Sequence, residues 1–448
     1  MQTSFSLAQL AASDTREADK ILRSCVHCGF CNATCPTYLE LGDELDGPRG
    51  RIYLIKDMLE HDRAPSERVV THIDRCLSCY ACITTCPSGV NYGHLVDQAR
   101  HRIEEQYRRP VMDRVLRAFL AAVLPRPRLF ALALTAGALV RPLRHILPAR
   151  LAAMLALGPA RPPAPPPVRR ALVFPAEGTR RHRVALLRVC AQEVLAPRID
   201  EATIRLLTRH GCEVVIAEGQ ACCGSLTHHM GRDARAMMRA AIDALTREID
   251  ARGLDAIVTN VSGCGATVKE YGYLFRDEPA YAAKAARVST LARDVSEFLA
   301  GIGLRGPTHA PALRIAYHAA CSLQHAQRIL AEPKALLVQA GFTVVEIPEG
   351  HICCGSAGTY NLLQPELSAA LRARKLAHIA TTAPDAVATG NIGCIMQLAS
   401  AGAYPVLHLA ELLDWATGGP PPAALVADGK SKESSEGLSA PSASAAAE

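Results

Sequence analysis

Two copies of one cysteine pattern near the start of the chain constrain its fold more than any other feature. Each copy has the spacing C-x2-C-x2-C-x3-C followed by proline, and the copies are Cys25, Cys28, Cys31 and Cys35, then Cys76, Cys79, Cys82 and Cys86. Three thiolates this close in one loop can bind three corners of an iron–sulfur cube, while the fourth is directed to a second cube. The spacing therefore predicts two neighbouring [4Fe–4S] clusters.

The two copies are expected to exchange their fourth ligands. The first cluster would be bound by Cys25, Cys28, Cys31 and Cys86, and the second by Cys76, Cys79, Cys82 and Cys35. This exchange holds the clusters close together, an arrangement that suits the transfer of single electrons. The alternative is that the same thiols hold structural zinc in a scaffold.

The remaining cysteines also favour metal over disulfides. The chain has 448 residues and 17 cysteines, an odd number, and its first twenty residues lack the basic end and apolar centre of an export signal. We therefore expect a cytoplasmic protein in a reducing compartment, where clustered thiols usually bind metal.

The segment between the two cysteine motifs predicts helix. Residues 49–60 have apolar residues at helical spacing, and Pro48 is placed to begin that helix. The ferredoxin-type unit, residues 1–110, is therefore expected to be α-helical. Arg49 or Arg51 would either bring positive charge to a cluster or lie solvated at the helix end.

The second half of the chain repeats itself. Residues 184–190 (VALLRVC), 211–224 (GCEVVIAEGQACCG) and 262–265 (SGCG) correspond to 315–321, 341–355 and 392–395. The offset is 131 residues for the first cysteine, 131 for the cysteine pair and 130 for the last cysteine. Runs of β-branched residues alternate with helical stretches, which indicates a parallel sheet in each repeat. The predicted fold class is α+β multidomain: a helical ferredoxin-type domain, then two tandem α/β Cys-Cys-Gly domains at 181–305 and 310–416.

Each repeat carries four corresponding cysteines. They are Cys190, Cys222, Cys223 and Cys264 in the first repeat, and Cys321, Cys353, Cys354 and Cys394 in the second. Thiolates that converge from strand ends suggest a further redox or metal site holding an iron–sulfur cluster or zinc. Alternatively, some are only small buried apolar residues. The unmatched Cys212 is expected in the core.

Four histidines accompany these cysteines. His228 and His229 follow the first Cys-Cys-Gly, and His318 and His325 flank Cys321. Each would either move protons coupled to electron transfer or serve as an ordinary core or surface residue.

Positive charge is concentrated between the ferredoxin-type unit and the repeats. Residues 100–170 contain 14 arginines, no lysine and three acidic residues, which gives +11 in a chain of net charge +6. Residues 112–123 have the spacing of an amphipathic helix, and residues 161–167 (RPPAPPP) form a stiff linker. This segment, 111–180, would face anionic lipid or an acidic partner, or be solvated. Nucleic acid is not expected, because only 4% of residues are aromatic.

Neither a membrane-spanning helix nor an ordered C-terminus is expected. The longest apolar run, residues 129–140, is too short to cross a bilayer. Residues 417–448, rich in Gly, Pro, Ser and Ala, predict a disordered tail.

The motifs together resemble the glycolate oxidase iron–sulfur subunit family. The resemblance rests on the paired cysteine motifs, the segment GPRGRIYLIK at 47–56, the tandem Cys-Cys-Gly repeats and SGCGATVKEYG at 262–272. The chain is similar, more loosely, to subunits of anaerobic glycerol-3-phosphate dehydrogenase, lactate-utilisation proteins and heterodisulfide reductase. Val261 and Asn391 stand where the last of these has a further cysteine, which argues against a five-thiolate cluster.

The resemblance implies an electron-transfer subunit, not the substrate-binding one. It would accept electrons from an FAD subunit that oxidises glycolate to glyoxylate, and pass them toward quinone at the inner membrane, where the chain would associate peripherally. The sequence has no Gly-rich dinucleotide fingerprint after a strand, so the acid would be oxidised on the partner. A lactate or glycerol 3-phosphate system, or a thiol catalyst like heterodisulfide reductase, is the alternative.

Overall fold

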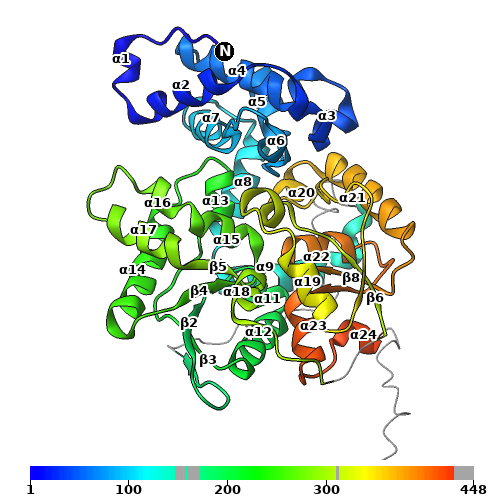
Figure 1. Ribbon diagram of the computed structural model, residues 1–448. Helices are drawn as coiled ribbons and strands as arrows, with labels where there is room; N and C mark the ends of the chain where they lie inside the picture. The colour runs from blue at the N-terminus through cyan, green and yellow to red at the C-terminus, as the bar shows by residue number, and fades with distance from the viewer. Residues whose placement is uncertain (147–154, 156–157, 159–171, 309–311, 428–448) are drawn as a thin grey trace, which may run out of the picture.

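The computed structural model describes residues 1–146, 155, 158, 172–308 and 312–427. A helical unit lies at one end of the molecule, and two sheet-containing units lie side by side beneath it (Figure 1). The proline-rich linker at 161–167 and the tail from 428 onward lie outside the described residues.

The N-terminal unit is built from helices, as predicted. Its elements are α1 (Leu7–Leu10), α2 (Ser13–Ser24), η1 (Phe30–Thr34), α3 (Pro36–Leu41), η2 (Glu44–Asp46), α4 (Pro48–Glu60), α5 (Glu67–Asp74), α6 (Ala81–Thr85) and α7 (Tyr92–Gln106). Helix α4 begins at Pro48, where the missing amide hydrogen costs no helical bond. Leu22, Ile55, Ile73 and Leu95 are fully buried and form the centre of its core.

Two helices connect this unit to the repeats. They are α8 (Val111–Val123) and α9 (Pro127–Val140), followed by the short η3 (Arg141–Ile146). Leu116 and Leu120 of α8 pack against Met230 and Leu363, while Met112 and Phe119 remain exposed. In the described part of the chain, no helix is both long and apolar enough to cross a bilayer.

Part of the basic segment is neutralised inside the protein. Arg109 and Arg117 are both buried and both pair with Asp74, at 2.6 and 2.9 Å. Arg109 also binds Glu104 at 2.6 Å, so these arginines fasten α8 to α5 and α7. Among the arginines of this segment whose side chains the structure describes, those left exposed are Arg108, Arg114, Arg126 and Arg128.

The two repeats have the same sheet topology. The first contains β2 (His182–Leu186), β3 (Cys212–Ile216), β4 (Ala256–Thr259) and β5 (Ala292–Asp294), and the second contains β6 (Arg314–Tyr317), β7 (Thr343–Val345), β8 (Ala386–Thr389) and β9 (Val406–His408). The parallel orders are β3-β2-β4-β5 and β7-β6-β8-β9, which agree with the prediction. A short β1 (Leu172–Phe174) adds an antiparallel edge strand to the first sheet. It precedes the predicted domain start and was not expected.

Helices cover the faces of both sheets. They are α11 (Gln192–Leu195), α12 (Pro197–Arg209), α13 (Ser225–His229), α14 (Arg235–Arg252), α15 (Ser262–Lys269), α16 (Tyr271–Leu274), α17 (Ala282–Leu291) and α18 (Val295–Ile302), then η4 (Ser322–Ala326), α19 (Glu332–Gln339), α20 (Tyr360–Leu363), α21 (Pro365–Ala380), α22 (Ile392–Ala399) and α23 (Leu409–Ala416). The repeats share continuous apolar cores, and α12 pairs with α23 through Arg205 and Asp414 at 2.7 Å.

The first part of the expected disordered tail is ordered. Residues 423–427 form α24 (Ala423–Ala427), and Leu425 is fully buried in the core that the repeats share. The prediction of a disordered tail from residue 417 is therefore wrong for residues 417–427. The amino-acid composition of this segment did not reveal that Leu425 is buried in the core.

Candidate metal centres

The two cysteine motifs of the helical unit fold into the same loop conformation. His27 and Gly29 in the first loop, and Ser78 and Tyr80 in the second, all have positive φ angles between 51° and 85°. These left-handed positions alternate with the cysteines and curl each loop around its thiols. A tyrosine seldom adopts this conformation, so the fold imposes it at Tyr80.

The first predicted ligand set lies around one pocket. Cys25, Cys28 and Cys31 line this pocket together with Cys86 from the end of α6, and Cys82 of the other predicted set also reaches it. Burial raises the pKa of Cys31 to about 11, and the nearby thiols of Cys25, Cys86 and Cys28 contribute to the shift. The structure therefore brings together the four cysteines of this set, although Cys86 is distant in sequence.

The second predicted ligand set is more deeply buried. Cys79 and Cys82 both interact electrostatically with Cys35 and Cys76, so Cys35 lies with the second motif. Tyr92 donates from its hydroxyl to the Cys76 sulfur at 3.6 Å, and the Ser78 amide approaches it at 3.4 Å. These donors favour the thiolate form that binds metal.

Two buried arginines bring positive charge to the second set. Arg51 is 1% exposed, and its guanidinium approaches the Cys35 sulfur at 3.8 Å. Arg100 donates to the carbonyl oxygen of Cys76 at 2.6 Å. Burial opposes ionisation of Cys76, but Arg51 and Arg100, together with the hydrogen bonds from Ser78 and Tyr92, outweigh it and lower the pKa of that thiol. Both helix-end arginines therefore bring charge to the thiols: Arg51 lies beside the second set, and Arg49 lines the pocket of the first set while it pairs with Glu44.

The four thiols of the first repeat converge at the carboxyl ends of its strands. The sulfurs of Cys190 and Cys222 lie 3.3 Å apart, and Cys223 is hydrogen bonded to Cys264. The contact between Cys190 and Cys222 raises the pKa of Cys190 and lowers that of Cys222. By contrast, Cys212 is fully buried in β3, in the core position that was predicted.

The second repeat assembles its thiols in the same way. The sulfurs of Cys321 and Cys353 lie 3.7 Å apart, and Cys354 contacts both Cys353 and Cys394. A ring nitrogen of His318 lies within 4.8 Å of the Cys354 and Cys394 sulfurs. The sequence singled out His318 because it flanks Cys321. It gave no sign that His318 lies near Cys394, which is 76 residues away.

The other three histidines do not join the thiols. His228 and His229 both pair with Asp97 of α7 at 3.3 Å. His325 Nδ1 and Thr84 Oγ1 share a hydrogen bond of 2.8 Å. These histidines connect the repeats to the helical unit.

The helical unit also contacts the second repeat through cysteines. Cys79 of the second ligand set packs in one apolar cluster with Cys353, and Cys321 lies against the same cluster. Arg374 pairs with Glu40 at 3.1 Å nearby. The second predicted cluster therefore lies next to the thiols of the second repeat.

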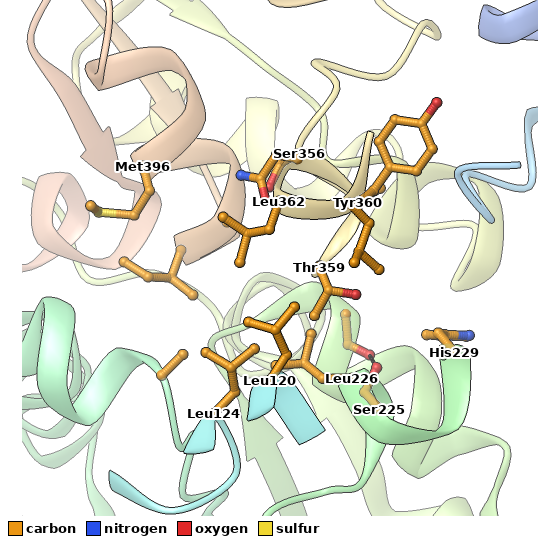
Figure 2. Close-up of a pocket in the computed structure, with 18 of the residues that line it drawn as sticks. Leu120, Leu124, Ser225, Leu226, His229, Ser356, Thr359, Tyr360, Leu362 and Met396 are labelled. Carbon is orange, nitrogen blue, oxygen red and sulfur yellow. Dashed lines mark hydrogen bonds between the residues drawn. The ribbon is translucent and has the colours of Figure 1, made fainter. Parts of the chain in front are cut away.

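Both sets of repeat thiols line one cavity of about 660 Å³. Leu120 of α8 and Leu124 just after it lie on one side of this space beside Leu226 of the first repeat, and Leu362 of the second repeat lies opposite (Figure 2). Ser225, His229 and Thr359 add polar groups to the lining. The Cys76 thiol contributes to the same lining. The cavity is thus mostly apolar, with the thiols along its wall.

The fold and these thiols define an iron–sulfur protein with a ferredoxin-type unit and two cysteine-rich repeats. Residues 21–90 match the 4Fe-4S dicluster domain family, and residues 184–269 and 315–399 match the cysteine-rich domain family. More particularly, the chain belongs to the family of glycolate oxidase iron–sulfur subunits.

The similarity to curated relatives extends over nearly the whole chain. The chain is 42% identical to the glycolate oxidase iron–sulfur subunit of Escherichia coli, covering 93% of this chain and 99% of that protein. It is 32% identical to a probable glycolate oxidase iron–sulfur subunit of Bacillus subtilis, covering 89% and 94%. A crystal structure of a hypothetical Helicobacter pylori protein shares the fold, with a TM-score of 0.52, 12% identity, and coverage of 93% of this chain and 74% of that one.

Proposed function

We propose that this protein carries electrons for a complex that oxidises glycolate. The observation that carries the proposal is that Cys86 lies at the pocket of the first cysteine loop, whereas Cys35 lies near Cys79 and Cys82 of the second. In the proposal, Cys25, Cys28, Cys31 and Cys86 bind one [4Fe–4S] cluster, and Cys76, Cys79, Cys82 and Cys35 bind the other. Each cluster, when bound, accepts and releases one electron at a time.

The protein's own residues would set the properties of the two sites. Arg51 and Arg100 favour the electron-rich state of the second cluster, because their charges lie beside its thiols and away from water. The first set is closer to the surface, since Cys28 is exposed. In the proposal, a partner protein would reach the first cluster, and the second cluster would lie toward the repeats.

The relatives' names support the choice of partner and substrate. An iron–sulfur subunit of a glycolate oxidase requires a separate flavoprotein that oxidises the acid, and the chain would accept electrons from that FAD subunit. We propose that the electrons then pass toward quinone. Peripheral contact with the membrane would use the exposed apolar residues of α8 and α9 and the exposed arginines beside them.

Metal and sulfide analysis tests the proposal first. Full-length protein purified without oxygen should contain about eight irons and eight acid-labile sulfides from these two clusters. Cys79→Ser should remove the signal of the second cluster in low-temperature paramagnetic spectra. Cys212→Ala, which changes a buried cysteine outside the thiol sets, is the matched control and should retain both clusters. Protein without iron, or with only zinc, would end the proposal.

Reduction by substrate tests the partner. The clusters should be reduced by glycolate only when the cognate flavoprotein is present. Lactate and glycerol 3-phosphate are the comparison substrates, and faster reduction by either would assign the chain to a different complex.

A further inference from the structure

The two cysteine loops share a backbone conformation, so they can be compared position by position. Their left-handed residues occupy matching places, and each cysteine of the second loop lies 51 residues after its counterpart in the first. The positions two residues before and two residues after the second cysteine of each loop are therefore equivalent. In this comparison, Val26, Cys28 and Phe30 of the first loop match Leu77, Cys79 and Ala81 of the second.

The second repeat covers these positions in the second loop. Leu77 and Ala81 are 6% and 0% exposed, and they pack with Cys79 in one apolar cluster. The residues that the second repeat contributes to this cluster include Ile352, Cys353, Tyr360 and Leu371. The apolar tip of the second loop is therefore an interface, and it brings a thiol of the repeat against a predicted ligand of the second cluster.

The matching positions of the first loop carry larger apolar side chains, and they are exposed. Val26 is 66% exposed and Phe30 is 62% exposed, on either side of Cys28, which is exposed as well. Tyr53 of α4 is also exposed and extends this surface, because its ring lies 6.4 Å from that of His27. We refer to Val26, Cys28, Phe30 and Tyr53 as the first-loop face. Apolar and aromatic side chains gathered at one exposed place are typical of a surface that a partner covers.

We propose that the first-loop face binds the flavoprotein that donates electrons to this chain, an inference that rests on the proposed function. The donor has to come close to the first cluster, and Cys28 is the predicted ligand of that cluster that reaches the surface. The flavoprotein would cover the first loop as the second repeat covers the second. A second copy of this chain would only bring two electron acceptors together, and lipid could not supply an electron.

The second loop also indicates what the partner must offer. Ile352, Tyr360 and Leu371 present an apolar surface to Leu77 and Ala81. We therefore expect the flavoprotein to present an apolar pocket that accepts Phe30, with Val26 and Tyr53 at its edge. Contacts between electron-transfer partners are usually small, and a buried aromatic anchor supplies much of their binding energy. Docking forms no covalent bond and moves no proton.

Binding of the cognate flavoprotein to full-length protein tests this face. The affinity would be measured by calorimetry without oxygen. Phe30→Glu should weaken binding about tenfold or more, because it replaces an apolar anchor with a charge that the interface would bury. Phe30→Ala should also weaken binding, and it introduces the residue that the second loop already has. Leu330→Glu is the matched control, because Leu330 is 56% exposed in the second repeat, and it should bind like the wild type.

Reduction of the clusters separates this inference from the function on which it rests. Both Phe30 variants should keep the iron content and the dithionite-reduced spectra of the wild type, whereas glycolate and limiting flavoprotein should reduce their clusters more slowly. Wild-type clusters that glycolate and flavoprotein do not reduce would overturn both the proposed function and the docking face. Normal reduction of the wild type with unchanged binding in both Phe30 variants would overturn the docking face alone. A dimer of this chain that Phe30→Glu dissociates, or loss of binding to anionic vesicles in that variant, would assign the face to another occupant and likewise overturn the inference.

Discussion

Replacement of Arg51 should lower the reduction potential of the second cluster. The guanidinium lies 3.8 Å from the Cys35 sulfur and is 1% exposed. A unit charge at that distance contributes about 4 kcal/mol at an effective dielectric constant of about 20. The added electron is spread over the cube, and Asp46 lies 3.6 Å from the guanidinium with opposite charge. About half of the energy, ~2 kcal/mol, should remain, which is about 85 mV for one electron.

The assay is a redox titration of full-length protein followed by paramagnetic spectra. Arg51→Met should shift the second cluster to a more negative potential by about 85 mV. Arg51→Lys keeps the charge and should shift it much less. Arg49→Gln is the matched control, because Arg49 is on the same helix but pairs with Glu44 beside the first set.

Two results would refute the electrostatic reasoning. The first is an unchanged potential in Arg51→Met with both clusters intact. The second is an equal shift in Arg51→Lys, because the effect would then come from the hydrogen bonds of the guanidinium to Thr37 and the His72 carbonyl, not from its charge.

Three further predictions concern packing, pH and lipid. Gly50→Ala should destabilise the helical unit by about 1 to 3 kcal/mol, since the added carbon would lie 2.2 Å from the Glu44 carbonyl oxygen. Gly301→Ala is the control, because the space around Gly301 is open, and it should not destabilise the protein. Equal melting temperatures of the two variants would contradict the prediction. Asp97 raises the pKa of His228 against the effect of burial, so the stability from this pair is present below the unfolded pKa of about 6.5 and is lost as pH rises through the higher folded pKa. Asp97→Asn should therefore flatten the dependence of the melting temperature on pH between pH 6 and 9, measured by calorimetry. An unchanged profile would show that the pair does not contribute to stability. Glutamine at the four exposed arginines of α8, α9 and their flanks should reduce binding to anionic vesicles in sedimentation assays, whereas unchanged binding would remove this surface from the proposed membrane contact.

The sequence predicted those features that depend on local spacing or on repetition. Each cysteine loop is seven residues long, so its conformation follows from neighbours along the chain. The convergence of Cys190, Cys222 and Cys264 followed from the repeat and from the rule that parallel strands end at the same edge.

Contacts between distant segments escaped the sequence analysis. The approach of His318 to Cys394 and the pairing of Arg109 with Asp74 depend on how whole elements pack. From composition alone, the arginine-rich segment was expected to be solvated or to bind a partner, and its ion pairs inside the protein were not predicted. Similarly, β1 forms only because β3 offers an open edge, and no pattern in its three residues indicates this.

The contact between Cys79 and Cys353 has a consequence for protein engineering. One apolar cluster combines three residues of the helical unit with residues of the second repeat, so the two do not form independent modules. Its members include Leu77, Cys79, Ala81, Ile352, Tyr360 and Leu371. A chimera that takes its ferredoxin-type unit from a relative must also take the facing segment around residues 351–371. Exchange at the linker alone would pair two surfaces that were not selected together.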